Sequence, residues 1–272
     1  MSESAVRNLV KLNPAKAQPG RMVNAAVGGQ DHFAADREAM YLASTVWEHS
    51  KKSMQTIPPY FQRLVRAMAN GGVDQFIVAA SSVPTGLPAG QQLHDIAAQI
   101  VPSARVVYLE HDVLVIVKAR ADLERGNDRI RVVEGDVINP KFALDDFVMR
   151  TFLDWSEPIG LVLPLHQLGG TDHLTTARTF LDRMVSGSYL GIHQVTFDHL
   201  PADRIPSVQK MIDETIAIPG IRSKAELEPI FDGLELLEPG ITWVPSWRPD
   251  GIDLYGPPPE ATGMYGALAR VP

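Results

Sequence analysis

Two histidines lie at the carboxyl ends of segments that we predict to be buried strands. His166, with Gln167 beside it, follows one apolar run, and His193 lies within the next. Histidine can take up and release protons near neutral pH. We therefore take His166 and His193 as candidate general bases and Gln167 as the side chain that orients a substrate. The alternative for each histidine is a structural role, with its ring satisfied by backbone hydrogen bonds.

Acidic residues follow two other predicted strands. Glu110, with His111 next to it, can accept hydrogen bonds from both hydroxyl groups of a ribose. Asp136, followed by Val137, can accept one from the exocyclic amine of an adenine. Asp112 is better explained as the cap of the next helix. A solvated turn residue is the alternative interpretation of Asp136.

The loop after the first predicted strand is rich in small residues and turn formers. It spans 79–90 and includes Ser81 and Ser82, but it contains no G-x-G-x-x-G motif, so the usual dinucleotide fingerprint is missing. The eight histidines form no helical i, i+4 pair with a carboxylate base, and no serine lies in a G-x-S-x-G elbow. We predict neither a metal site nor a hydrolase triad.

Apolar runs of strand length alternate with helical patterns through the middle of the chain. The strands are expected at 75–80, 105–110, 130–134, 159–165 and 189–195, with helices at 91–100, 113–123, 144–155 and 174–185. This alternation implies parallel pairing with both sheet faces covered, that is, a doubly wound α/β sheet.

Helical patterns also flank this region. Two helices, one from Asp31 to Trp47 and one over 59–70, are expected before the first strand. After the fifth strand we expect helices at 207–216 and 224–234, and the strand-like runs 241–244 and 264–271 predict a closing antiparallel pair.

Composition narrows the class of protein. The chain has 272 residues, 45% of them apolar, and 25 basic against 32 acidic side chains give a net charge of −7. Such a chain is typical of a soluble globular protein and favours neither nucleic acid nor a membrane surface as partner. It has no cysteine, no secretory signal and no apolar stretch of roughly 20 residues. We expect a cytoplasmic protein, a homodimer, that acts on a small molecule.

Several strings resemble a known family. The segment 28–38, GGQDHFAADRE, resembles the GGKDNFAADRE signature of an actinobacterial family of S-adenosylmethionine-dependent methyltransferases. The segment 104–112, ARVVYLEHD, is similar to that family's ARVVYVDNDP, and 135–140 and 233–240 follow the same pattern. The resemblance covers nearly the whole chain after residue 20.

The resemblance implies a fold and a domain organisation. The fold is the class I methyltransferase fold, a Rossmann-like, mostly parallel sheet of seven strands with an antiparallel last strand. We expect a flexible N-terminal arm over 1–20, a helical lid over 21–73 and the methyltransferase core over 74–272. The expected cofactor is S-adenosylmethionine, held by Gly28, Gly29, Asp31, Ser81, Ser82, Glu110, His111, Asp136 and Val137.

The departures from the family pattern concern the cofactor loop. Where the family has roughly FLDIGSGLPT, Val78 replaces the acid, and either 80–82 or 84–86 replaces the Gly-x-Gly turn. Loss of one charge-assisted hydrogen bond costs about 1.5–3 kcal/mol, or roughly ten- to a hundredfold in affinity. We therefore expect a degenerate motif that binds the methionine half of the cofactor weakly.

Three functions remain open at this point. The first is methyl transfer to a small molecule of specialised metabolism. The second is a methyltransferase-like enzyme that catalyses a cyclisation, isomerisation or elimination, with or without bound cofactor, and draws its acid and base from His166, His193 or His94. The third is a scaffold without catalysis, because fold alone does not fix function.

Overall fold

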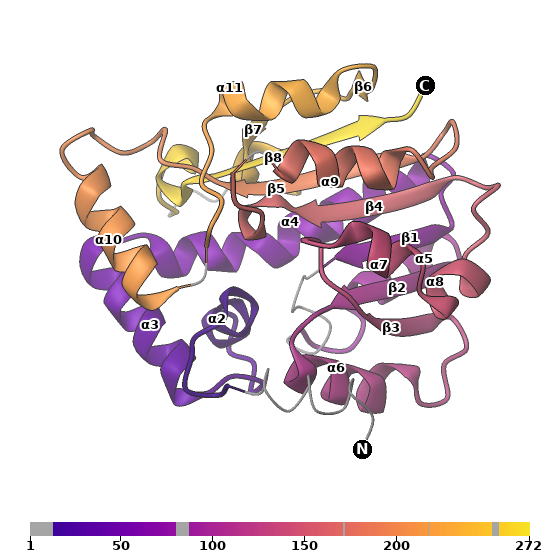
Figure 1. The fold of residues 1–272 in the computed structure, drawn as a ribbon, viewed down its shortest axis with the longest axis horizontal. Coiled ribbons are helices and arrows are strands. Elements are labelled where there is room, and N and C mark those ends of the chain that lie inside the picture. The colour runs from indigo at the N-terminus through magenta and orange to yellow at the C-terminus, as the bar shows by residue number, and fades with distance from the viewer. Residues whose placement is uncertain (1–12, 80–86, 171, 217, 252–255) are drawn as a thin grey trace.

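Five parallel strands form the centre of the computed structural model, which describes residues 13–79, 87–170, 172–216, 218–251 and 256–272. The strands are β1 (Gln75–Ala79), β2 (Arg105–Glu110), β3 (Ile130–Glu134), β4 (Ile159–Pro164) and β5 (Tyr189–Val195). Each agrees with its predicted run to within one residue. The order of these five strands in the sheet is β3-β2-β1-β4-β5 (Figure 1).

The sheet closes with antiparallel strands, as the sequence predicts. β8 (Met264–Arg270) pairs with β5, and β6 (Glu235–Leu236) and β7 (Thr242–Trp243) both pair with β8. With β7, which lies off the main path, the sheet has eight strands rather than the expected seven. β6 has only two residues, both exposed, so it shows neither the alternation nor the apolar run of a strand.

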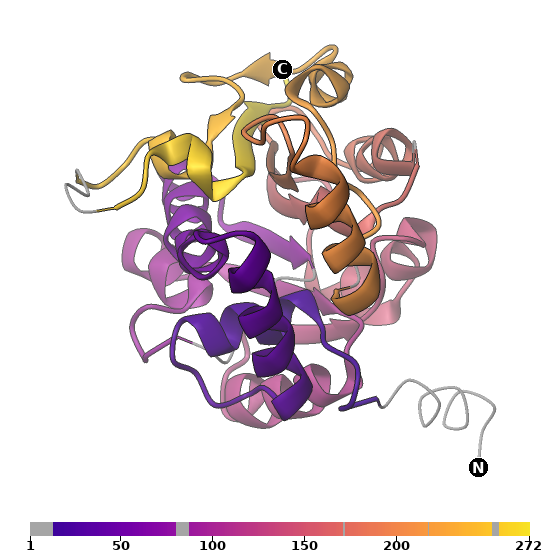
Figure 2. The ribbon, with the colours of Figure 1, turned by 90° about the vertical axis from the view of Figure 1, so that its left-hand side faces the viewer.

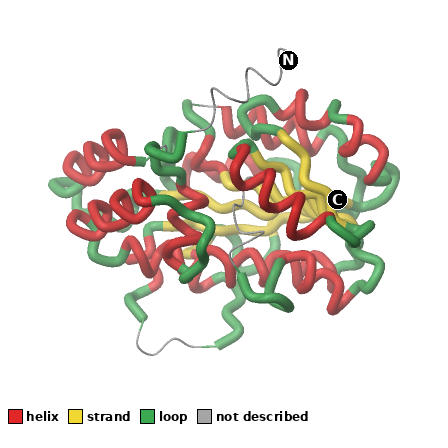
Figure 3. The backbone as a smooth tube through the Cα atoms, turned by 90° about the horizontal axis from the view of Figure 1, so that it is seen from below, coloured by secondary structure: helices red, strands yellow, loops and turns green. Residues whose placement is uncertain are grey.

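Helices cover both faces of the sheet, so its strands lie enclosed (Figure 3). One face packs against α4 (Ser50–Asn70), α5 (Leu93–Ile100) and α6 (Val113–Ala119). The other packs against α7 (Pro140–Leu144), α8 (Phe147–Phe152), α9 (Asp172–Leu181) and α11 (Lys224–Leu227). In β1, Phe76 and Val78 belong to the first core and Ile77 to the second, which explains the continuous apolar run.

A third helical group lies beyond the carboxyl ends of the parallel strands. It consists of α2 (Pro19–Ala26), α3 (Ala34–Val46) and α10 (Ile205–Thr215), which share a small core of their own (Figures 1 and 2). Ligands of open parallel sheets bind at this edge. Within the described ranges, no helix is both long and apolar enough to cross a bilayer.

The helix boundaries correct the sequence predictions in three places. α2 was not predicted. α4 begins at Ser50 rather than at residue 59, and it contains Pro58 and Pro59. Prolines inside a helix remove hydrogen bonds, but the buried side chains of Ile57 and Tyr60 on either side pack against the sheet and favour continuation.

The third correction concerns helices that divide. The expected helix 144–155 is two helices, because the Asp146 Oδ1 atom accepts hydrogen bonds from the backbone N–H groups of Val148 (2.7 Å) and Met149 (3.3 Å) and starts α8. The helix expected over 113–123 is α-helical only as far as the end of α6, and one π-helical turn, η1 (Arg120–Glu124), follows it. The helix expected over 224–234 changes after α11 to a 3₁₀ turn, η3 (Glu228–Phe231), which contains Pro229.

Helix α4 approaches the sheet closely over a glycine, and this contact supports a stability prediction. The Tyr60 hydroxyl donates to the Ile192 carbonyl (2.6 Å), and a Cβ atom at Gly266 would lie 2.4 Å from the Tyr60 ring. We expect Gly266→Ala to destabilise the protein by about 1–3 kcal/mol through overpacking. The matched control is Gly251→Ala, where a Cβ meets nothing within 4 Å. Equal thermal unfolding midpoints for the two variants would contradict this packing argument.

Candidate active site

The two candidate histidines meet at the carboxyl ends of β4 and β5. The sheet register places Pro164 opposite His193, and His166 follows in the 3₁₀ turn η2 (Leu165–Gln167). The two imidazole rings are perpendicular, with centroids 5.4 Å apart. The Phe61 ring of α4 lies 5.8 Å from that of His193. Two neighbouring strands and one helix therefore position this pair.

Burial keeps both histidines neutral. His166 is 8% exposed and His193 is 1% exposed. Burial, and then the charge of Arg222, lowers the pKa of His166 to about 4. Burial, and then His166, holds the pKa of His193 well below its ordinary value. At neutral pH each ring therefore carries one donor and one acceptor nitrogen. The Nδ1 atom of each has no hydrogen-bond partner in the part of the chain that is described.

A buried arginine fixes the loop that carries His166. The Arg222 guanidinium donates to the carbonyls of Leu165 (3.1 Å), Leu168 and Gly170 (2.9 Å), and to the Gln194 amide oxygen (3.2 Å). All four acceptors are neutral. Arg222 therefore ties the segment after β4 to the residue that follows His193, and it places a positive charge near the His166 ring.

An apolar pocket of about 540 Å³ lies beside the histidines. Its polar lining residues are His166, Gln167 and His193. Its other lining residues are Pro19, Gly20, Met22, Val23, Met54, Ile57, Phe61, Pro164, Val195, Ile216, Ile218 and Met264. We call the site lined by all of these residues the apolar pocket. The sequence-predicted catalytic residues are thus brought together at one wall.

A second, more polar pocket of about 430 Å³ adjoins the first. It is lined by Gln18, Pro19, His111, Asp136, Ile138, Gln167 and Pro219, and we call it the polar pocket. The two pockets share Pro19 and Gln167. Three of the sequence-predicted site residues, His111, Asp136 and Gln167, therefore meet here from the ends of three different strands.

Glu110, the last residue of β2, is held by the backbone next to it and is not among the lining residues of either pocket. The buried Glu110 carboxylate accepts hydrogen bonds from the backbone N–H groups of His111 (2.8 Å) and Asp112 (3.0 Å). The Asp112 carboxylate accepts from the Leu114 N–H (3.0 Å) and caps α6, so the cap interpretation of Asp112 is confirmed. Val137 is fully buried, and its carbonyl accepts from the Thr176 hydroxyl (3.1 Å).

The polar pocket fits the adenosine half of S-adenosylmethionine. The Asp136 Oδ1 atom accepts from the Ile138 N–H (2.8 Å), while Oδ2 has no partner among the described residues and can accept from an amine. The Ile138 side chain is 62% exposed in this pocket and offers an apolar surface to a flat ring. Ser81 and Ser82, predicted for the methionine half, lie outside the described residues. Val78 is buried in the core of the sheet and supplies no carboxylate.

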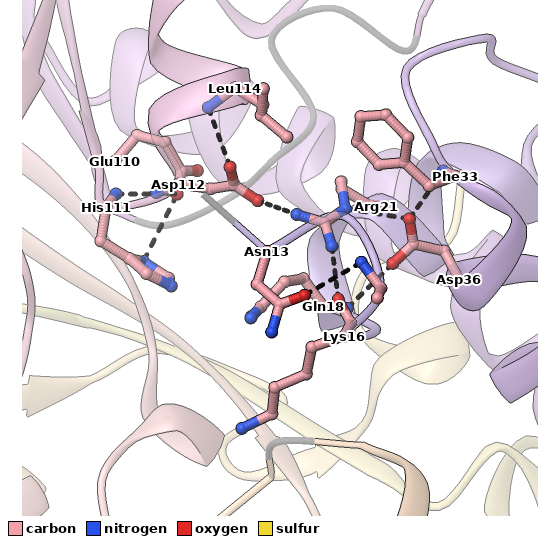
Figure 4. Close-up of polar contacts among 11 residues, drawn as sticks. Asn13, Lys16, Gln18, Arg21, Phe33, Asp36, Glu110, His111, Asp112 and Leu114 are labelled. Atoms are coloured by element: carbon pink, nitrogen blue, oxygen red, sulfur yellow. Dashed lines mark hydrogen bonds and ion pairs between the residues drawn. The ribbon is translucent and has the colours of Figure 1, made fainter. Parts of the chain in front are cut away.

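A buried ion-pair network joins the N-terminal helices to the core next to this pocket (Figure 4). The Arg21 guanidinium binds the carboxylate of Asp36, at 2.9 Å, and that of Asp112. Asp36 also accepts from the backbone N–H groups of Gln18 (2.9 Å) and Phe33 (2.8 Å). Asp36 belongs to the 28–38 string, so one role of that string is to anchor α2 and α3.

The beginning of the same string forms the turn after α2. Gly28 has a φ of +83°, and a Cβ atom at Gly29 would lie 2.6 Å from the Asn24 amide. The Asp31 N–H donates to the Asn24 amide oxygen (2.9 Å), and its carboxylate pairs with Lys118 of α6 at 3.5 Å. Gly28, Gly29 and Asp31 are not among the lining residues of either pocket. Their contact with the cofactor stays a prediction.

Sequence reasoning missed Arg21 and Arg222. Most of their contacts are with residues far away in the chain, and no local pattern marks either of them. Asp36 carries a weak signal, because an acid in the first turn of a helix is a common capping residue.

The fold is the class I methyltransferase fold. A family model described as S-adenosyl methyltransferase matches residues 6–272, and the chain belongs to this family. The family's donor is S-adenosylmethionine, and the chain is a methyltransferase-like enzyme. The resemblance, the fold class and the cofactor predicted from the sequence are thereby confirmed.

Two solved structures are similar over almost the whole chain. A putative methyltransferase from Thermobifida fusca is 28% identical, with 94% of this chain and 96% of that one covered and a TM-score of 0.83. A DUF574 family protein from Streptomyces avermitilis is 32% identical, with 94% and 98% covered and a TM-score of 0.83. No curated protein matches this chain.

Proposed function

We propose that this chain transfers the methyl group of S-adenosylmethionine to a small molecule of specialised metabolism. The observation that carries the proposal is the pair of adjoining pockets, one with the Asp136 carboxylate suited to the adenine amine and one apolar with two neutral histidines. The apolar pocket has the lining typical of small-molecule sites, which is mostly apolar with a few polar groups at one wall. The absence of cysteine suits a reducing cytoplasm, and we keep that location and a homodimer in the proposal.

The polar pocket would hold the cofactor. Asp136 would accept from the adenine amine, Glu110 and His111 would lie at the ribose, and Ile138 would pack against the base. When bound, S-adenosylmethionine supplies an electrophilic methyl group. Ser81 and Ser82 are proposed for the methionine half, and Gly28, Gly29 and Asp31 for closing the N-terminal turn over the site.

The apolar pocket would hold the acceptor. The neutral imidazole of His166 takes the proton that the acceptor loses, and Gln167, which lines both pockets, orients the acceptor. His193 packs against the His166 ring and completes the polar wall. The apolar lining excludes water, so the contribution of the protein is mostly orientation and desolvation.

Calorimetric titration with S-adenosylhomocysteine tests this proposal. We expect binding in the micromolar range for the stripped protein, and about ten- to a hundredfold weaker binding for Asp136→Ala, because one charge-assisted hydrogen bond is lost. The matched control is Asp145→Ala, at an exposed carboxylate that lines neither pocket. Absence of binding at millimolar concentrations would rule out methyl transfer by this chain.

A second candidate function rests on the histidine pair. Two imidazoles with centroids 5.4 Å apart in an apolar pocket can act as acid and base on one substrate without methyl transfer, as a cyclisation, isomerisation or elimination requires. The product distinguishes the two functions. Methyl transfer replaces one hydrogen of the acceptor by a methyl group and raises its mass by one CH2 unit, whereas a cyclisation or isomerisation leaves the mass unchanged and an elimination lowers it.

A further inference from the structure

The polar groups of the apolar pocket are confined to one wall. His166, Gln167 and His193 come from the ends of β4 and β5, whereas the lining residues from α2 and α4, and also Ile216 and Ile218, are apolar. Gln167 also lines the polar pocket. A ligand would therefore direct its polar group toward the junction of the two pockets and its apolar body toward α2 and α4.

The lining also selects against charge. Among the residues that the structure describes, no lining residue of the apolar pocket carries a carboxylate, an ammonium or a guanidinium group. Arg222 lies nearby but is not a lining residue, and its guanidinium group donates hydrogen bonds to four neutral acceptors. An ionised ligand would lose its hydration on entering the pocket and would gain no opposite charge in return. This desolvation costs several kcal/mol per ion. An uncharged ligand avoids this cost.

The histidines favour a hydroxyl group as the polar group of the ligand. The His193 Nε2 atom lies 3.1 Å from the Met264 sulfur, which can only accept, so the proton belongs on Nε2. A hydroxyl both donates and accepts, so it matches the neutral His166 ring, which carries one donor and one acceptor nitrogen. The low pKa of His166 makes it a weak base. An acidic hydroxyl, that of a phenol or an enol, suits such a base better than an aliphatic alcohol does.

We propose that the apolar pocket takes an uncharged phenol or enol with an apolar body, and that its hydroxyl oxygen is the atom methylated at the junction of the two pockets. This inference rests on the proposed methyl transfer. The acceptor's O–H bond breaks and its proton moves to the His166 imidazole. The oxygen bonds to the methyl carbon, and the electron pair of the broken carbon–sulfur bond stays on sulfur, leaving S-adenosylhomocysteine as the second product.

Matched probes test the charge and the hydroxyl separately. The full chain, saturated with S-adenosylhomocysteine, is titrated calorimetrically with phenol, 2-naphthol and 4-phenylphenol, with their parent arenes, and with benzoate, 2-naphthoate and 4-phenylbenzoate. We expect at least one phenol to bind about tenfold more tightly than both its arene and its carboxylate, the size of one net hydrogen bond. If no phenol exceeds its carboxylate, or none exceeds its arene, the inference is wrong.

Pocket-filling variants assign the binding to this pocket. Val23→Phe and Met54→Phe, which add volume at two lining residues, should each abolish binding of the preferred phenol. Val117→Phe, at a side chain 64% exposed on α6, is the control and should bind it normally. Met54 is only partly buried, so its variant tolerates the added volume if Val23→Phe does not fold. Undiminished phenol binding by a folded pocket variant would overturn the assignment.

A second titration keeps this inference distinct from the proposed function. If the protein binds a phenol but not S-adenosylhomocysteine, when titrated with each alone, the methyl transfer fails and the ligand class of the pocket stands. If it binds S-adenosylhomocysteine but prefers carboxylates, methyl transfer stands and the phenol inference is overturned. With S-adenosylmethionine present, an O-methyl ether as product supports the assigned atom, and a C- or N-methylated product refutes it.

Discussion

Replacing His166 by alanine should lower methyl-transfer turnover at least about a hundredfold while leaving the affinity for S-adenosylhomocysteine within about twofold. The imidazole lines the apolar pocket and not the polar pocket, so its loss removes the proton acceptor without disturbing the residues proposed for adenosine. Steady-state rates on the best phenol of the panel, together with calorimetric titration, measure the two quantities.

The pH dependence of the rate gives an independent readout for His166. Its pKa is lowered to about 4 by burial and by the charge of Arg222. The imidazole is therefore free to accept a proton above that pH, and protonation removes the base below it. We expect the rate to fall as the pH drops through about 4, and this acid limb should disappear in His166→Ala.

The control for His166 is His94→Ala. The His94 ring contacts the Tyr108 hydroxyl (2.9 Å) and lines neither pocket. His94 is also one of the three histidines that could supply the acid or base for a cyclisation, isomerisation or elimination. An unchanged rate in His166→Ala would remove His166 from the mechanism, and a large loss in His94→Ala would shift the acid–base chemistry to α5.

The parallel strands could be predicted because both faces of the sheet are buried. A strand that is buried along its whole length, such as β4, appears in the sequence as a continuous apolar run. Features that depend on tertiary packing could not be predicted. The helical turns before Pro58 make contacts with distant residues, since Ser53 donates to the Thr262 carbonyl and Gln55 to the Ala26 carbonyl, and β6 exists only through its pairing with β8.

Candidate site residues could be predicted where they lie at the carboxyl ends of predicted strands. His166, His193 and Asp136 each follow from the rule that ligands bind at the carboxyl edge of a parallel sheet. The adjacency of the two histidines depends on the pairing of β4 with β5, which no local pattern reveals. The contacts of Arg21 with Asp112 and of Arg222 with Leu165 join residues 91 and 57 positions apart, so only the folded chain shows them.

Arg222 offers a test of how the protein sets the properties of His166. Its guanidinium holds three carbonyls of the loop after β4, and its charge contributes to the low pKa of His166. The carboxylates of Glu226 and Asp172 also act on Arg222. The residue therefore has two separable effects on His166, one geometric and one electrostatic, and we assign it a positioning role.

Two substitutions separate these effects. Arg222→Gln removes the charge and the fork of donors. The His166 pKa should therefore rise above about 4, while burial, the larger cause, keeps it below its ordinary value, and turnover should fall at least about tenfold. Arg222→Lys keeps the charge but cannot reach several carbonyls at once, so the pKa should stay low while turnover still falls. NMR titration of the histidine rings measures the pKa without any substrate.

The matched control for these variants is Arg178→Gln, at an arginine that donates to the Asp232 carbonyl on the surface (2.7 Å) and lines neither pocket. Carbonyls left unpaired in Arg222→Gln destabilise the fold by about 1–3 kcal/mol each. The titrations are therefore run well below the unfolding midpoint, and Arg222→Lys alone decides the geometric effect if Arg222→Gln does not fold. A purely structural arginine would lower stability and leave the His166 pKa unchanged. That result in Arg222→Gln, with normal turnover in Arg222→Lys, would show that Arg222 supports the fold and does not tune the base.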